Sequence, residues 1–157
     1  MTSPFADCGA TLCREERVLS FRKESFPYEA QFYRCDKTGL EFTTTELDES
    51  NLGQVYDAYR RKYGIPSPEE IKATRKQYSL SAAKMSAVLG LGINQYRLYE
   101  SGEMPSESIG KFLKCIETPS VFRLVLRNAR GQFSDAEFKR IEARVKNTDS
   151  RVNEVCL

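Results

Sequence analysis

Apolar and polar residues follow two different periods in the first 63 residues. From Arg17 to Phe42 apolar and polar side chains alternate, and many of the apolar ones are aromatic, which is typical of strands with one buried face. We predict three short antiparallel strands there. From Glu46 to Tyr63 the apolar residues recur at helical spacing, with Thr44 or Thr45 as the candidate N-cap. Residues 1–63 are therefore expected to form a small antiparallel sheet followed by a helix.

Residues 64–68, which read Gly-Ile-Pro-Ser-Pro, interrupt this pattern, and the spacing is helical from there on. Ser67 is the predicted N-cap of the next helix, with Pro68 in the first helical position and two glutamates in the first turn. This arrangement predicts a helix from residue 68 to about residue 78. Further helices are predicted over residues 82–89, 93–100, 106–117, 119–129 and from Ser134 onward, with a frayed tail from Asn147.

The predicted fold class is α+β, in three parts: an N-terminal α+β module over residues 1–63, an all-α domain over 64–119 and a C-terminal helical extension over 120–157. No stretch approaches about 18 uninterrupted apolar residues, and the N-terminus lacks the basic and apolar regions of a secretory signal. We therefore expect a cytoplasmic protein without a membrane span. Its five cysteines, an odd number, favour reduced thiols, and Cys115 is expected to be buried on an apolar helical stripe.

Two short predicted helices joined by a glycine-containing turn at residues 90–92 have the layout of a helix-turn-helix DNA reader. One set of side chains is expected to converge in a small core: Met85, Val88, Leu89, Leu91, Tyr96 and Tyr99. The predicted base-reading set points the other way: Ile93, Asn94, Arg97 and Leu98. Asn pairs bidentately with adenine and Arg with guanine, and an apolar side chain such as Leu98 can contact a thymine methyl group. An ordinary helical bundle with a polar surface is the alternative.

The same segment carries charge of one sign. Between Ile71 and Tyr99 there are five basic side chains and no Asp or Glu. Such a stretch suits a phosphate-facing surface, although a solvated helix face is the simpler alternative. The predicted phosphate contacts are Arg75, Lys76 and Lys84, together with Ser81 through its hydroxyl group and the helix N-terminus that it caps.

The composition argues against an enzyme. The chain has no histidine, which excludes Ser-His and Cys-His nucleophile pairs and any His-ligated metal. Ser81-x-x-Lys84 and Lys37-Thr38-Gly39 match two motifs of serine β-lactamases, but their order in the chain is reversed and the Ser-Asp-Asn motif is missing. An N-cap and a hairpin turn explain both motifs.

Several runs resemble known families. Residues 80–90 begin with Leu-Ser and end with Leu-Gly, and residues 95–102 read Gln-Tyr-Arg-Leu-Tyr-Glu-Ser-Gly, which resembles the Cro-type (XRE) helix-turn-helix pattern. Residues 68–75, Pro-Glu-Glu-Ile-Lys-Ala-Thr-Arg, follow a cysteine-containing module and resemble the MqsA (YgiT-type) antitoxin family. The resemblance covers about residues 8–118. It implies an XRE domain over 64–119, base contact at Asn94, repression of the protein's own operon and a toxin as partner.

The chain departs from these patterns at several positions. Ala82 replaces the XRE glutamine after the capping serine, and Leu98 stands where an arginine is usual, with Arg97 one position earlier. The MqsA family binds zinc through two Cys-x2-Cys pairs. Here the first pair is stretched to Cys8-x4-Cys13, and the second has Cys35 but Thr38 in place of its other cysteine. We expect no metal and no other cofactor, and the sequence leaves open whether the three thiols still bind zinc.

The leading hypothesis is a sequence-specific DNA-binding transcriptional repressor and antitoxin of a type II toxin-antitoxin system, which binds operator DNA as a homodimer. A second hypothesis is a protein-interaction adaptor whose helix-turn-helix fold has lost DNA binding, which Ala82 and Leu98 favour. A third is a metal-sensing regulator.

Overall fold

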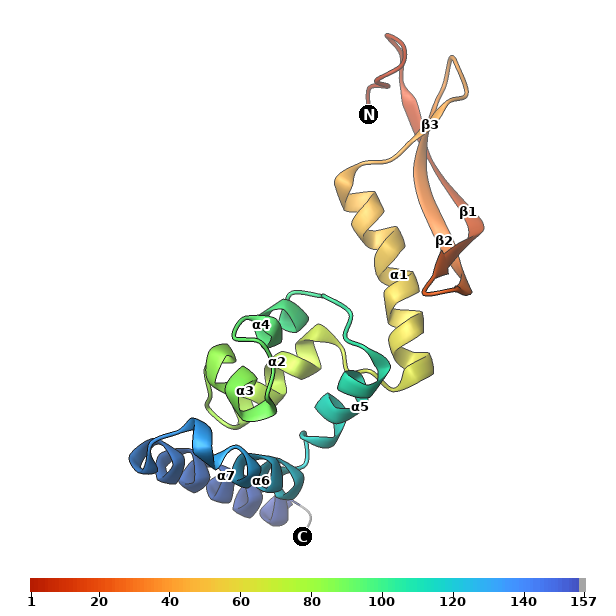
Figure 1. Cartoon of the computed structure of the whole chain (residues 1–157). Coiled ribbons are helices and arrows are strands. Elements are labelled where there is room, and N and C mark those ends of the chain that lie inside the picture. Colours follow the sequence, from red (N-terminus) through yellow and green to blue (C-terminus); the bar gives the residue numbers. More distant parts are fainter. Residues whose placement is uncertain (156–157) are drawn as a thin grey trace. The chain divides into compact units, whose positions relative to one another are not determined.

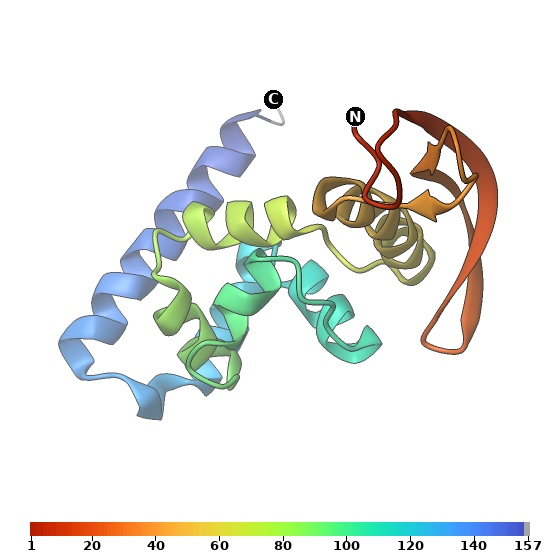
Figure 2. The ribbon, with the colours of Figure 1, turned by 90° about the horizontal axis from the view of Figure 1, so that it is seen from above.

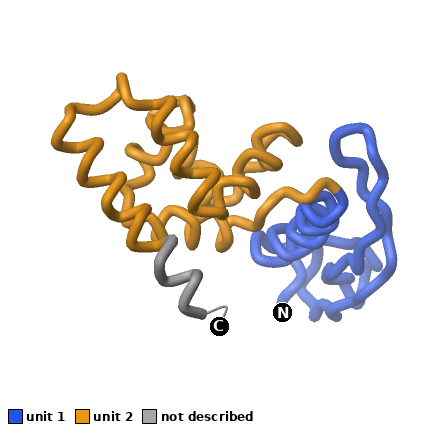
Figure 3. Tube along the Cα trace, turned by 90° about the horizontal axis from the view of Figure 1, so that it is seen from below, with its two compact units in different colours: residues 1–62 blue, residues 63–157 orange. Residues whose placement is uncertain are grey.

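The computed structural model describes residues 1–155, with the side chains of residues 1–148 (Figure 1). The fold is α+β, as predicted: a three-stranded antiparallel sheet precedes a series of helices. The chain forms two compact units, which divide between Lys62 and Tyr63 (Figure 3). The predicted boundary between residues 119 and 120 is not a boundary between units, because the C-terminal helices belong to the second one.

A long hairpin dominates the first unit. Strands β1 (Ala10–Phe21) and β2 (Glu24–Cys35) pair in antiparallel register along their whole length, and β3 (Glu41–Phe42) adds a short pairing to β2. Arg22 and Lys23 form the connecting turn with φ values of 48° and 67°, the left-handed conformation that a tight two-residue hairpin requires. The prediction of three short strands was wrong for two of them. The first half of β1 is mostly exposed, and its apolar and polar residues do not alternate regularly, so it carries no strand signal.

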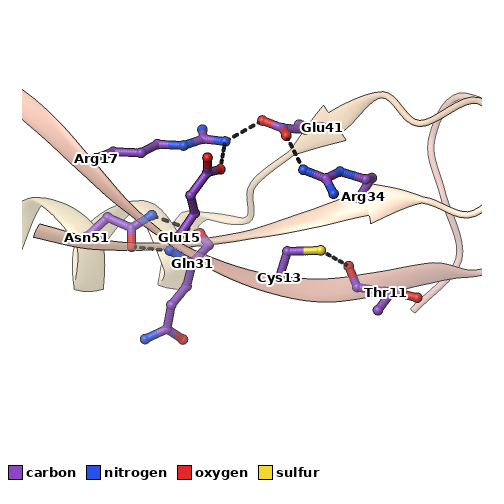
Figure 4. Close-up of polar contacts among 8 residues, drawn as sticks. All are labelled: Thr11, Cys13, Glu15, Arg17, Gln31, Arg34, Glu41 and Asn51. Carbon is purple, nitrogen blue, oxygen red and sulfur yellow. Dashed lines mark hydrogen bonds and ion pairs between the residues drawn. The ribbon is translucent and has the colours of Figure 1, made fainter.

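Helix α1 (Thr45–Tyr63) packs on the hairpin. Thr44 is its N-cap, since its Oγ1 accepts a hydrogen bond from the Leu47 amide at 3.3 Å. Tyr59 lies edge-on to Phe21, with ring centroids 5.0 Å apart. Side-chain amides of α1 also bond to the backbone of β2 at 2.9–3.0 Å: Asn51 to both N–H and C=O of Gln31 (Figure 4), and Gln54 to those of Glu29. These amides satisfy a part of the strand edge that β3 does not reach.

The second unit is helical, and three of its serine caps, Ser67, Ser81 and Ser134, lie where the sequence predicts them. Its elements are α2 (Pro68–Gln77), α3 (Ala82–Leu89), α4 (Gln95–Glu100), α5 (Glu107–Cys115), α6 (Pro119–Asn128), a 3-10 turn η1 (Arg130–Gln132) and α7 (Asp135–Val155). Ser67 and Glu70 form a full capping box, and Ser81, Ser106 and Ser134 cap the starts of α3, α5 and α7. Three helices differ from prediction by two or more residues at one end: α4 begins at Gln95 rather than 93, α5 ends at Cys115 rather than 117, and α7 continues past Asn147 to Val155.

One hydrophobic core joins the helices of the second unit. It includes side chains of α2, α3, α4, α5, α6 and α7: Ile71, Tyr78, Leu80, Met85, Val88, Leu89, Tyr96, Tyr99, Leu113, Ile116, Phe122, Leu126, Phe138, Ile141 and Val145. Tyr78, the C-cap residue of α2, and Phe122 of α6 stack with centroids 4.0 Å apart. Cys115 is exposed, so the expectation of a buried thiol there was wrong: it lies on the solvent side of α5, opposite Leu113. Among the described residues, none of the helices is both long and apolar enough to span a membrane.

Candidate nucleic-acid interface

Helices α3 and α4 form a helix-turn-helix held by specific polar contacts. Gly90 ends α3 in the left-handed conformation at φ 69°, which glycine adopts without strain. Ser86 of α3 accepts a hydrogen bond from the Tyr96 amide at 3.1 Å, and the Tyr96 hydroxyl donates to the Ile71 carbonyl of α2 at 2.7 Å. Burial raises the pKa of Tyr96, so this phenol remains a donor at neutral pH. These contacts fix α4 against α2 and α3.

The predicted core and the predicted surface of this motif are both as expected. The core residues on α3 and α4 are buried, and Leu91 packs against them. The base-reading set is exposed, with Ile93 at 74% and Leu98 at 43% relative exposure and Asn94 and Arg97 also open to solvent. Asn94 occupies the N-cap position of α4 but makes no side-chain cap hydrogen bond. The structure therefore brings these four side chains to one exposed face at the start of α4.

The face of α4 carries a positive charge because its acidic residue is turned inward. Glu100 on the same helix is paired with Arg75 of α2, and only 11% of its side chain is exposed. Among the ion pairs of the described residues, none involves Arg97. An uncompensated guanidinium beside an exposed amide is the chemistry that a major-groove contact requires.

Arg75 is a correction to the predicted phosphate set. Its guanidinium binds both carboxylate oxygens of Glu100, one of them at 3.1 Å, and donates to the Leu80 carbonyl at 3.0 Å. The Glu100 contact raises the pKa of Arg75, and the side chain is only 19% exposed. A guanidinium committed to three acceptors has little capacity left for a phosphate, so Arg75 joins α2, α4 and the loop before α3 instead.

The other predicted phosphate contacts differ in their availability. Lys76 and Ser81 are exposed. The Ser81 oxygen accepts from the Lys84 amide at 3.2 Å, which leaves its hydroxyl proton to donate elsewhere. Lys84 is half-buried, and its ammonium lies 3.2 Å from a carboxylate oxygen of Glu137 on α7. Lys84 therefore faces a competing anion from its own chain.

Sequence reasoning missed Glu137 and the placement of α7. The contact with Lys84 lowers the pKa of Glu137 most, and hydrogen bonds with Ser134 lower it further, so the carboxylate is charged at neutral pH. The ion pair's contribution to stability is present above pH 4.5 and is lost as the pH falls through the lowered pKa. Farther along α7, which is the long blue helix of Figure 2, Arg144 donates to the Ser79 carbonyl at 2.9 Å and Thr148 to the Gln77 carbonyl at 3.2 Å. No local pattern signals contacts between residues 53 to 71 positions apart.

The cysteines do not form the zinc site of the family that the sequence resembles. Cys8 and Cys35 are neighbours, with their sulfurs 3.2 Å apart, but Cys13 donates to the Thr11 carbonyl at 3.6 Å (Figure 4). Within the described part of the chain, no three side chains of the Cys, Asp or Glu type are grouped as metal ligands. Structural zinc sites require four ligands in a closed tetrahedron, which this arrangement does not supply.

Comparison with known proteins gives no independent identification, because no family model and no curated protein matches the chain.

Proposed function

We propose that the protein is a sequence-specific double-stranded DNA-binding repressor. The observation that carries the proposal is the exposed face at the start of α4, where Asn94 and Arg97 lie outward on a helix whose other face is fixed in the core. The residue types match the hydrogen-bonding groups that base pairs display in the major groove. A buried core below this face holds it in one orientation, as base reading demands.

In this function each residue has a separate role. Asn94 forms two hydrogen bonds with an adenine, Arg97 does the same with a guanine, and the exposed apolar side chains of Ile93 and Leu98 contact thymine methyl groups. Lys76 and Lys84 attract phosphates, and Ser81 donates its hydroxyl to one at the N-terminus of α3. Phosphate contacts supply affinity and base contacts supply sequence preference.

We also propose an oligomeric state, a protein partner and a cellular location for the repressor. A single short helix reads few base pairs, so we propose a homodimer on two half-sites of an operator. Following the MqsA resemblance, we propose that the repressor is an antitoxin in the cytoplasm and that its first unit binds the toxin. That unit has a hollow of about 280 Å³ over the sheet and α1, with Leu19, Phe32 and Leu52 in its lining, which suits an apolar side chain of a protein partner.

A protein-interaction adaptor is the second candidate, and one observation favours it. Ile93 and Leu98 make half of the exposed set apolar, and the acidic Glu103 lies beside it, accepting a hydrogen bond from Gln95 at 2.7 Å. An adaptor would use this face for a protein and would not bind DNA. A repressor would therefore bind duplex DNA with an affinity that falls as the salt concentration rises, whereas an adaptor would not bind the duplex.

The test is a fluorescence-anisotropy titration of the full chain with a labelled pool of random duplexes at 50 mM and 200 mM salt. A DNA-binding protein that neutralises several phosphates loses roughly tenfold or more in affinity over this range. Replacing Lys76 and Lys84 together by alanine is expected to flatten the salt dependence, whereas Lys111→Ala, which removes an exposed lysine from α5, is the matched control. Absence of any complex at 50 mM salt would favour the adaptor.

A further inference from the structure

Cys8 and Cys35 form a pair of thiols that the proposed DNA-binding function does not use. Their sulfur atoms lie 3.2 Å apart although 27 positions separate them in the chain. A disulfide bond needs a sulfur separation of about 2.05 Å, so only a small adjustment of the two side chains is required. The two other described cysteines are not part of this pair: Cys13 bonds to the Thr11 carbonyl, and Cys115 lies in the other unit.

The backbone around the pair holds the two thiols together. The two residues after Cys8 bond to the end of the main sheet: the Asp36 amide donates to the Gly9 carbonyl at 3.1 Å, and Ala10 pairs with Cys35 in the register of β1 and β2. The Ser3 amide donates to the Cys8 carbonyl at 2.9 Å, so the N-terminal segment folds back over this end of the sheet. Backbone hydrogen bonds of Cys8 and of the two residues after it therefore hold the two sulfur atoms close together.

We propose that Cys8 and Cys35 are a redox modification site, which a hydroperoxide converts into a reversible intramolecular disulfide that fixes the N-terminal segment to the end of the sheet.

The environments of the two thiols assign them different roles. Cys35 is buried at 1% exposure and receives a hydrogen bond from the Thr38 amide at 3.4 Å. Hydrogen bonds from Ser3 and Thr38 lower the pKa of Cys35 to about 6, which favours its thiolate at neutral pH. Cys8 is half-buried, so it is the thiol that hydrogen peroxide reaches. The hydrogen bond with Cys35 raises the pKa of Cys8, so Cys8 reacts through the small fraction that is thiolate. Its exposure makes Cys8 the site of first oxidation, and Cys35 is the resolving thiolate.

The reaction balances in two steps. The Cys8 thiolate attacks one oxygen of hydrogen peroxide, the O–O bond breaks, and Cys8 becomes a sulfenic acid with release of hydroxide. The Cys35 thiolate then attacks the Cys8 sulfur, the S–O bond breaks, and a second hydroxide leaves as the S–S bond forms. The two thiol protons and the two hydroxides give two waters. A dithiol reductant reverses the change by thiol-disulfide exchange.

The test uses the full-length chain, treated with hydrogen peroxide, alkylated to block free thiols and analysed by intact and peptide mass spectrometry. We expect a mass loss of two hydrogens, a peptide crosslinked between Cys8 and Cys35, and complete reversal by dithiothreitol. The bond closes a long loop, so thermal unfolding of the oxidised first unit is expected at a midpoint about 5 °C higher or more.

Single cysteine substitutions distinguish a disulfide between Cys8 and Cys35 from oxidation at the other cysteines. Cys8→Ser and Cys35→Ser are each expected to abolish the crosslink, while Cys13→Ser and Cys115→Ser retain it. Mapping on the unsubstituted chain does not depend on whether a variant folds. The proposal is overturned if peroxide carries Cys8 to sulfinic acid without a crosslink, if the crosslink joins other cysteines, or if the pair holds stoichiometric zinc that blocks oxidation.

Discussion

Two arginines of the second unit, Arg75 and Arg97, have the same chemistry but different surroundings. Arg97 lies on the exposed face of α4 and forms no ion pair among the described residues, whereas Arg75 is held by Glu100 and by the Leu80 carbonyl. The exposed guanidinium of Arg97 is accessible for contact with a base. Arg75 holds the negative charge of Glu100 away from the face that Arg97 occupies, so under the proposed function the two arginines would support DNA binding in different ways.

Replacing Arg75 by alanine tests this division. Glu100 would be left mostly buried without its partner, so we expect Arg75→Ala to lower the free energy of unfolding by about 3 kcal/mol, measured by chemical denaturation. Arg75→Lys retains the charge but not the paired geometry. Its free energy of unfolding is therefore expected to lie between those of Arg75→Ala and the unsubstituted chain. Lys111→Ala removes an exposed pair with Glu107 and is expected to change stability by less than about 0.5 kcal/mol. A stable Arg75→Ala protein with weakened DNA binding would instead make Arg75 a phosphate contact.

At the scale of elements, α5 depends on a close approach between Gly110 and Ile65. A Cβ at position 110 would lie 2.5 Å from the Cγ1 atom of Ile65, which is itself buried. Alanine gains about 1 kcal/mol in helix propensity, but overpacking costs about 1 to 3 kcal/mol. We expect Gly110→Ala to destabilise the second unit, as measured by thermal unfolding. Gly53→Ala in α1 meets nothing within 4 Å and is the control, expected to be stabilising. Equal stabilisation by both substitutions would contradict the packing of α5.

Helix α7 affects the interface through Glu137. Glu137→Gln removes the carboxylate that pairs with Lys84 while preserving a side chain that can complete the Ser134 cap. Exposed ion pairs are weak, so releasing Lys84 is expected to raise the affinity for any duplex by no more than about fivefold in an anisotropy titration. Glu142→Gln alters another acid on the same helix, paired with Lys146 at 3.9 Å, and is expected to leave affinity unchanged. Unchanged or weaker binding by Glu137→Gln would mean that Lys84 does not contact phosphate.

Local signals explain which elements the sequence could predict. Ser67, Ser81 and Ser134 act on amides within three residues, so helix starts could be located from the residues alone. The outward face of α4 followed from helical spacing. The polar half of β1 could not be predicted, because its pairing with residues 29–35 leaves no hydrophobic alternation. The partners of Arg75 and Lys84 are 25 and 53 positions away and also left no local signal.

At the scale of the whole molecule, the chain divides its chemistry between two units. The first contains the hairpin, the thiol pair and the apolar hollow, and the second contains the helix-turn-helix. Helices α6 and α7 belong to the second unit through Phe122 and Ile141, so the described side chains of these two helices complete the core of the helix-turn-helix. Truncation after residue 119 would therefore expose that core.

The most direct test of the central claim is selection from a pool of randomised duplexes by the full-length protein, followed by affinity measurements on the selected site. We expect the unsubstituted chain to enrich a common sequence. Asn94→Ala is expected to weaken binding to that sequence by about 1 to 3 kcal/mol, with little change on random duplexes, while Asn128→Ala on α6 has no effect. No enriched sequence, or equal affinity of Asn94→Ala and the unsubstituted chain for the selected site, would contradict base reading by α4.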